Sequence, residues 1–134
     1  MHIKVGVGVL IFNEANQILL GKRLSQHGYG TWACPGGHLE LYETPFDCAI
    51  RETQEETGLI ISDLEKGPWV NTIFREDSHH YVTVFMLTRH YKGTPRVLEP
   101  DKCAEWQWFD INALPTPLFA TIAMLLEDGM FPTI

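Results

Sequence analysis

The chain has 134 residues, enough for one hydrophobic core and too few for two, so we expect residues 1–134 to form a single domain. The 17 acidic residues outnumber the 10 basic ones, and the formal net charge of −7 argues against a protein that binds a nucleic-acid polymer through a basic surface. The three cysteines, odd in number and without CxxC spacing, indicate neither a disulfide framework nor a zinc knuckle and favour a reducing, cytoplasmic location.

The N-terminal part of the chain has the pattern of two strands. Residues 5–11 place a β-branched side chain at every second position, which predicts a strand. Turn-forming residues 13–16 and the extended apolar pattern of residues 17–22 then predict a hairpin. The apolar run 5–12 is too short and too β-branched for a signal peptide or a membrane span, so we expect no membrane partner. Glycines within residues 25–31 predict a loop.

A helix is predicted from Pro45 to Thr57. Thr44 can cap its N-terminus, Pro45 suits the first helical position, and Asp47 complements the positive end of the helix dipole. Gly58 is well placed to end the helix.

The second half of the chain predicts further strands and one more helix. The strand candidates are residues 69–74, 81–88 and 105–109. Apolar residues at helical spacing between Pro117 and Gly129 predict a C-terminal amphipathic helix, whose apolar face either joins the core or forms a homodimer surface. Two helices among these strands indicate an α/β protein with helices packed on a mixed sheet.

Three carboxylates are expected to converge on the first helix. Glu52, Glu55 and Glu56 stand at i, i+3 and i+4, so they project from one face. Like charges at this spacing repel and favour recruitment of a cation. Oxygen ligands select hard cations, and Mg²⁺ takes one or two carboxylates and completes its shell with water and phosphate oxygens. The pattern therefore indicates a site for phosphate chemistry.

Residues around the three glutamates strengthen this interpretation. Gly36 and Gly37 lack side chains, so their backbone could approach a metal or an anion directly. The forked guanidinium of Arg51 could hold Glu43 by bidentate hydrogen bonds. An acidic helix face alone is usually only a solvated surface. The joint spacing is more specific, and its members are Gly37, Glu43, Arg51, Glu52, Glu55, Glu56 and Gly58.

Residues 37–59, GHLELYETPFDCAIRETQEETGL, match the pattern Gx5Ex7REUxEExGU, in which U is a bulky aliphatic residue, except for Thr53 at the first U. The chain thus resembles the Nudix hydrolases, and segments outside this box, such as VGVGVLIF and CPGGHLE, resemble the MutT-type nucleoside triphosphate diphosphatases. The resemblance implies a Nudix fold, an α/β/α sandwich with a central mixed β-sheet. It also implies hydrolysis of a nucleoside diphosphate linked to a group X.

Carried over by position, the resemblance implies roles for individual residues. The metal ligands would be the Gly36 carbonyl with Glu52, Glu55 and Glu56. The catalytic set would be Glu52, Glu55, Glu56, Arg51 and Glu105, with the general base left open between Glu52 and Glu105. The residues expected to contact substrate are Lys22, Arg23, Gly37 and His38.

The expected reaction is Mg²⁺-dependent hydrolysis of a nucleoside triphosphate to the monophosphate and pyrophosphate, with Mn²⁺ as a substitute metal and a small nucleotide as the partner. Two alternatives remain open: ADP-ribose or a dinucleotide as substrate, and a non-catalytic nucleotide-binding module. A proline about sixteen residues after the box, typical of ADP-ribose hydrolases, is absent. Trp106, Trp108 and Phe109 either stack on a nucleobase or pack in the core, and His79 and His80 are expected at a strand entrance.

Overall fold

The computed structural model describes residues 2–132, which form nine strands and two helices. In chain order these are β1 (Ile3–Ile11), β2 (Gln17–Arg23), β3 (Trp32–Ala33), β4 (Gly36–His38), α1 (Pro45–Thr57), β5 (Ile60–Ser62), β6 (Glu65–Phe74), β7 (His79–Thr88), β8 (His90–Lys92), β9 (Cys103–Asp110) and α2 (Ala120–Glu127). The long strands and both helices were predicted from sequence. The short strands β3, β4, β5 and β8 were not.

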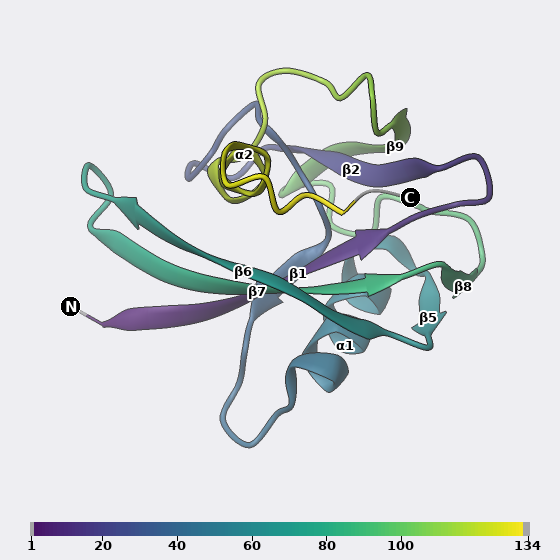
Figure 1. Ribbon diagram of the computed structural model, residues 1–134, viewed down its shortest axis with the longest axis horizontal. Coiled ribbons are helices and arrows are strands. Elements are labelled where there is room, and N and C mark those ends of the chain that lie inside the picture. The colour runs from purple at the N-terminus through teal and green to yellow at the C-terminus, as the bar shows by residue number, and fades with distance from the viewer. Residues whose placement is uncertain (1, 133–134) are drawn as a thin grey trace.

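A mixed four-stranded sheet lies at the centre of the molecule, in the order β4-β1-β7-β6. Strands β1 and β7 run parallel over nine residue pairs, and the other two pairings are antiparallel. The two helices lie on opposite faces of this sheet, with the second sheet, β3-β2-β9, on the same side as α2 (Figure 1). The expected sandwich of helices around a mixed sheet is therefore confirmed.

The predicted N-terminal hairpin forms only at its turn. The Asn13 backbone N–H donates to the Gln17 carbonyl at 3.0 Å, and the Asn13 side chain accepts from the Gln17 N–H at 2.9 Å. Beyond a single bridge between Phe12 and Ile18, β1 and β2 separate and enter different sheets. Longer pairings elsewhere, β1 with β7 and β2 with β9, take the backbone groups that a hairpin would have used.

From Gly6 to Ile11, strand β1 is buried on both faces. Val7, Val9 and Ile11 pack in the cluster that includes Ala49 of α1, whereas Leu10 packs with α2 in a second cluster. A strand that is covered on both sides has a nearly continuous apolar sequence, as residues 7–12 do. Among the described residues, 2–132, neither α1 nor α2 has the length and apolar sequence that a membrane-spanning helix needs.

Helix α1 has the predicted bounds because its end signals are local. The Thr44 hydroxyl accepts from the Asp47 N–H at 3.1 Å, and Pro45 occupies the first turn. Gly58 adopts the left-handed conformation, with φ of 80°, and donates to the Gln54 carbonyl at 3.0 Å.

The apolar face of α2 belongs to the core. Ile122 and Leu125 are fully buried within the single chain, against residues of β1, β2, β6 and β7. Trp108 and Phe109 of β9 also pack against the two core clusters, which is the second of the two roles considered for these aromatics.

Candidate active site

Helix α1 and strand β4 border an open cavity of about 620 Å³. Glu52, Glu55 and Glu56 all line it, so the face predicted from their spacing is real. Their environments differ: the Glu52 side chain is 18% exposed and that of Glu55 is 52% exposed, whereas Glu56 is largely buried. The carboxylates thus run from the mouth of the cavity to its inner wall.

The inner carboxylate cannot easily carry a charge without a cation. Burial, followed by the neighbouring Glu52 carboxylate, raises the pKa of Glu56 to about 9, and Glu99 adds to the effect. A buried pair of carboxylates needs either a proton or a positive ion between them. The donors are hard oxygen atoms, so the residues present fit Mg²⁺ or a similar divalent ion. No group of three or more His, Cys, Asp or Glu side chains within residues 2–132 is already gathered as a ligand set.

Arg51 connects the helix to the loop before it. Its Nε and Nη2 donate to the two carboxylate oxygens of Glu43 at 2.7 and 3.0 Å, the bidentate contact expected from sequence. Its Nη1 donates to Glu52 at 2.7 Å and reaches Glu55 at 3.5 Å. The guanidinium holds the pKa of Glu43 at about 2, and these carboxylates raise the pKa of Arg51. Glu43 therefore stays ionised and fixes Arg51 beside the cavity.

The two glycines of β4 allow the loop to approach the helix closely. Gly36 and Gly37 pair with Gly8 and Val7 of β1. A Cβ on Gly37 would overlap the Glu52 carboxylate, and one on Gly36 would overlap the Val7 carbonyl oxygen. Backbone and carboxylate oxygens therefore meet in one small space, where a cation could contact both.

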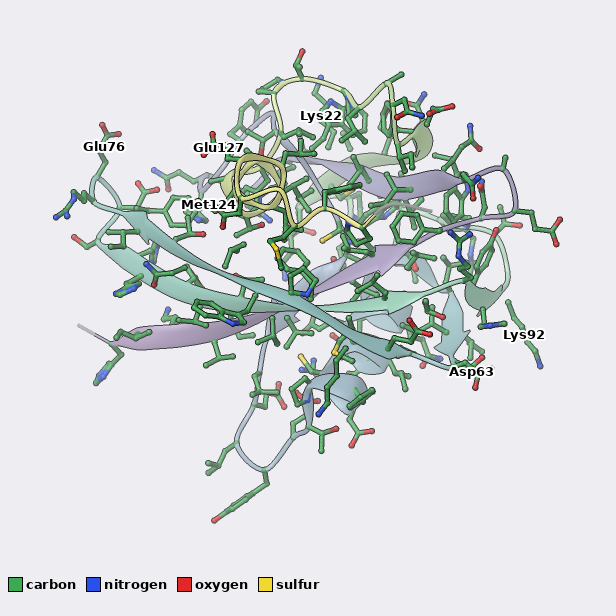
Figure 2. All side chains as sticks on the ribbon, viewed as in Figure 1. Lys22, Asp63, Glu76, Lys92, Met124 and Glu127 are labelled. Atoms are coloured by element: carbon green, nitrogen blue, oxygen red, sulfur yellow. The ribbon has the colours of Figure 1, made fainter. Side chains whose placement is uncertain are left out.

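Of the other predicted site residues, Arg23 and His38 line the cavity, whereas Lys22 and Glu105 do not. Side chains alternate between the two faces of a strand, so Lys22 points away when Gly21 and Arg23 face the cavity. Figure 2 shows Lys22 far from α1, on the opposite side of the molecule. On β9, Cys103 and Trp106 line the cavity but the exposed Glu105 between them does not, because the pairing of β9 with β2 is irregular at this point.

The structure adds cavity residues that the sequence interpretation missed. Glu99 and Lys102 come from the turn before β9, where the Lys102 N–H donates to the Glu99 carbonyl at 2.9 Å. The charged and proline-containing run of residues 99–102 was a usable signal for this turn. Cys34 lies at the inner wall, and burial raises its pKa to about 12, so its thiol stays protonated and is a poor nucleophile.

A smaller cavity of about 150 Å³ adjoins the first and shares Arg23, Cys34, Glu56 and the β4 glycines with it. Its other walls include the aromatic rings of Phe74, Tyr81 and Phe119. The ring centroids of Phe74 and Phe119 are 6.0 Å apart, and the Arg23 guanidinium lies 4.4 Å from the Phe119 ring centroid. Burial lowers the pKa of Arg23, an effect that the nearby Glu56 carboxylate opposes. One guanidinium therefore lies between a carboxylate-rich cavity and an aromatic one.

Comparison with known proteins decides the family. The NUDIX domain pattern matches residues 2–128 of this chain. The chain belongs to the Nudix family. It is a hydrolase of phosphorus-containing anhydrides with nucleotide substrates, and Nudix hydrolases generally use divalent metal ions.

Individual Nudix relatives differ in the substrates that their names give. The MutT NUDIX hydrolase of Burkholderia pseudomallei superposes with a TM-score of 0.89 at 31% identity, covering 95% of this chain and 98% of that one. An 8-oxo-dGTP diphosphatase of Proteus vulgaris is 34% identical over 69% of this chain and 80% of its own length. An ADP-ribose pyrophosphatase of Methanocaldococcus jannaschii is 31% identical over 89% of this chain and 69% of its own. The similarity of the chain to the last two is too even to choose between their substrates.

Proposed function

We propose that the protein hydrolyses a nucleoside triphosphate to the nucleoside monophosphate and pyrophosphate in a magnesium-dependent reaction. One observation carries this proposal: the carboxylate-rich cavity adjoins an aromatic one, and Glu56 and Arg23 belong to both. The first suits metal-bridged phosphates, and the second suits the flat face of a nucleobase. A triphosphate is consistent with the relationship to the 8-oxo-dGTP diphosphatase of Proteus vulgaris, and so is a role in cleaning the nucleotide pool.

Glu52, Glu55 and Glu56, with the Gly36 carbonyl, would hold Mg²⁺, and Mn²⁺ would substitute. Bound there, the ion would offset the charge of the phosphoryl oxygens and acidify a water molecule. The support is chemical. These residues supply hard oxygen donors, and the neighbouring Glu52 carboxylate disfavours ionisation of the buried Glu56 unless a cation is present.

The remaining charged residues would bind and orient the substrate. Arg23, between the two cavities, would contact phosphate close to the nucleoside, and Lys102 would contact the outer phosphates. Arg51 donates to Oε1 of Glu52 and orients this carboxylate, which would accept a proton from the attacking water. Lys22 and Glu105 have no part in this proposal because they face away from both cavities.

We further propose that the matched region acts as one catalytic domain on small nucleotides in the cytoplasm. The net charge of −7 supports small nucleotides over a nucleic-acid polymer, because only a local site with bound cations would attract phosphate. ADP-ribose is the second candidate substrate, on the strength of the relative from Methanocaldococcus jannaschii.

The test is product analysis on a panel of nucleoside triphosphates, ADP-ribose and diadenosine polyphosphates, with Mg²⁺, with Mn²⁺ and with a chelator. We expect monophosphate and pyrophosphate from a triphosphate, only when metal is present. Glu52→Gln and Glu56→Gln should each lower kcat by about 100-fold or more. Glu127→Gln, an exposed glutamate on α2 (Figure 2), is the matched control and should retain activity.

Three results would change the conclusion. Faster cleavage of ADP-ribose to AMP and ribose 5-phosphate would establish the second candidate substrate. Turnover in the presence of chelator would remove the metal from the proposal. Wild-type activity in Glu56→Gln would overturn its assignment as a ligand.

A further inference from the structure

His27 lies at the aromatic end of the smaller cavity, in the loop between β2 and β3. Its ring meets Phe74 edge-on at 4.3 Å and Phe119 edge-on at 5.5 Å between centroids. It lines only this cavity and not the carboxylate-rich one. If phosphates occupy the larger cavity, His27 therefore borders the space that remains for the nucleobase.

Asp77 fixes the hydrogen-bonding role of the His27 ring. His27 Nδ1 and Asp77 Oδ2 are 2.9 Å apart. An ionised carboxylate can only accept, so Nδ1 must carry the proton and donate. Asp77 belongs to the tip of the β6–β7 hairpin, where its neighbour Glu76 projects outward (Figure 2). This hairpin tip thus determines the tautomer of a residue in a different loop.

The other ring nitrogen is buried without a partner. Within the described part of the chain, His27 Nε2 has no hydrogen bond and almost no solvent contact. With the proton on Nδ1, the neutral ring presents Nε2 as an acceptor. A buried acceptor left unpaired costs free energy that a suitable donor would recover. The nearest guanidinium, of Arg23, already donates to the His27 carbonyl at 3.0 and 2.9 Å.

We propose that His27 determines base specificity by accepting, at Nε2, a hydrogen bond from an amino group on the nucleobase edge farthest from the sugar, and that Asp77 is its positioning residue. This inference rests on the proposed function and names the chemical group that the site selects. The aromatic walls bind the face of any base. Nε2 gives a higher affinity for a base that offers an N–H donor and a lower affinity for one that does not. The base preferred is therefore one that carries an exocyclic amine.

The experiment compares pairs of nucleoside monophosphates that differ by one amino group. The pairs are adenosine with purine riboside, guanosine with inosine, and cytidine with 2-pyrimidinone riboside. Dissociation constants are measured by calorimetry at pH 8.5, and kcat/KM is measured for the matching triphosphates. We expect the wild-type protein to favour the amino-bearing member of at least one pair by about 10-fold, the value of one satisfied buried hydrogen bond.

The variants separate recognition from structure. His27→Phe keeps the aromatic packing and should reduce that ratio to about 1, whereas His27→Gln, which retains an acceptor oxygen, should restore part of it. His80→Phe is the matched control: its Nε2 bonds to Asn71 at 2.6 Å, and it lines neither cavity. Asp77→Ala should lower the ratio and Asp77→Asn should preserve it, because the amide oxygen still accepts from Nδ1. If His27→Phe does not fold, the two exposed Asp77 variants carry the test.

The outcomes distinguish this inference from the proposed function. An unchanged ratio in His27→Phe, or no preference by the wild type in any pair, overturns the role of His27 even if triphosphates are hydrolysed. A His27-dependent ratio in binding, without triphosphate hydrolysis, supports the role of His27 and overturns the proposed reaction. Preference for the member that lacks the amine would show that Nε2 donates, which also overturns the inference.

Discussion

Arg51 and Glu52 are adjacent in the helix, yet Arg51 Nη1 lies 2.7 Å from Glu52 Oε1. Neighbouring helical residues normally project in different directions. The contact forms because Glu43, across the loop, holds the other two guanidinium nitrogens and turns the fork back along the helix. One arginine therefore sets the orientation of a carboxylate at the cavity, and its effect should depend on the shape of the guanidinium as well as its charge.

Replacing Arg51 by lysine should test this dependence. Arg51→Lys keeps a positive charge but cannot bond to Glu43 and Glu52 together. We expect kcat/KM to fall by about 10- to 100-fold, as for other residues that orient metal ligands. Steady-state kinetics at saturating Mg²⁺ measure the change. Arg75→Lys, at an exposed hairpin position, is the control and should have no effect. Wild-type kcat/KM in Arg51→Lys would show that charge alone suffices.

Glu56 should make the stability of the metal-free protein depend on pH. Its pKa is raised from 4.5 to about 9, so the folded state binds its proton more tightly than the unfolded state does. The resulting stabilisation is fully present below pH 4.5 and is lost as the pH rises towards about 9. Mg²⁺ replaces the proton, so it should raise the melting temperature more at pH 8.5 than at pH 5.5.

Thermal unfolding with and without chelator, between pH 5 and 9, measures this effect. Glu56→Gln resembles the protonated side chain, so its metal-free form should lose less stability over this pH range than the wild type. Glu127→Gln, remote from the cavity, should follow the wild-type curve. An equal pH dependence in Glu56→Gln and wild type would assign the effect to other groups.

The features predicted well from sequence are those that depend on nearby residues. The bounds of α1 follow from a capping hydroxyl, a proline and a glycine within or next to the helix. The convergence of its three glutamates follows from helical periodicity. The contact of Arg51 with Glu43 spans only eight residues, so the spacing of the box was enough to predict it.

The features that were missed depend on contacts between distant segments. The aromatic cavity joins His27, Phe74, Tyr81 and Phe119, which come from the β2–β3 loop, the β6–β7 hairpin and the segment before α2. Strand alternation requires that adjacent Lys22 and Arg23 face opposite sides, but the partners of β2 decide which one meets the cavity. Those partners, β3 and β9, are far from β2 in sequence or too short to recognise.

Thr53 is a residue for which both the sequence and the structure are needed. It is the one departure from the Nudix box, at a position where the pattern has a bulky aliphatic residue. The structure shows that Thr53 is fully buried and that its hydroxyl has no hydrogen-bond partner within the described residues. A buried hydroxyl without a partner costs free energy, and valine has the same shape without this cost.

Thr53→Val should therefore raise the free energy of unfolding by about 1 kcal/mol, measured by urea denaturation, with kcat unchanged. The matched control is Thr57→Val, one turn later and equally buried. The Thr57 hydroxyl donates to the Thr53 carbonyl at 2.7 Å and accepts from the Leu59 N–H at 3.0 Å, so its loss should lower the free energy of unfolding by about 1–3 kcal/mol. Opposite changes in the free energy of unfolding for the same threonine-to-valine substitution would identify hydrogen bonding as the cause. If both variants were destabilised equally, the Thr53 hydroxyl would have to have a partner in solution, such as a buried water.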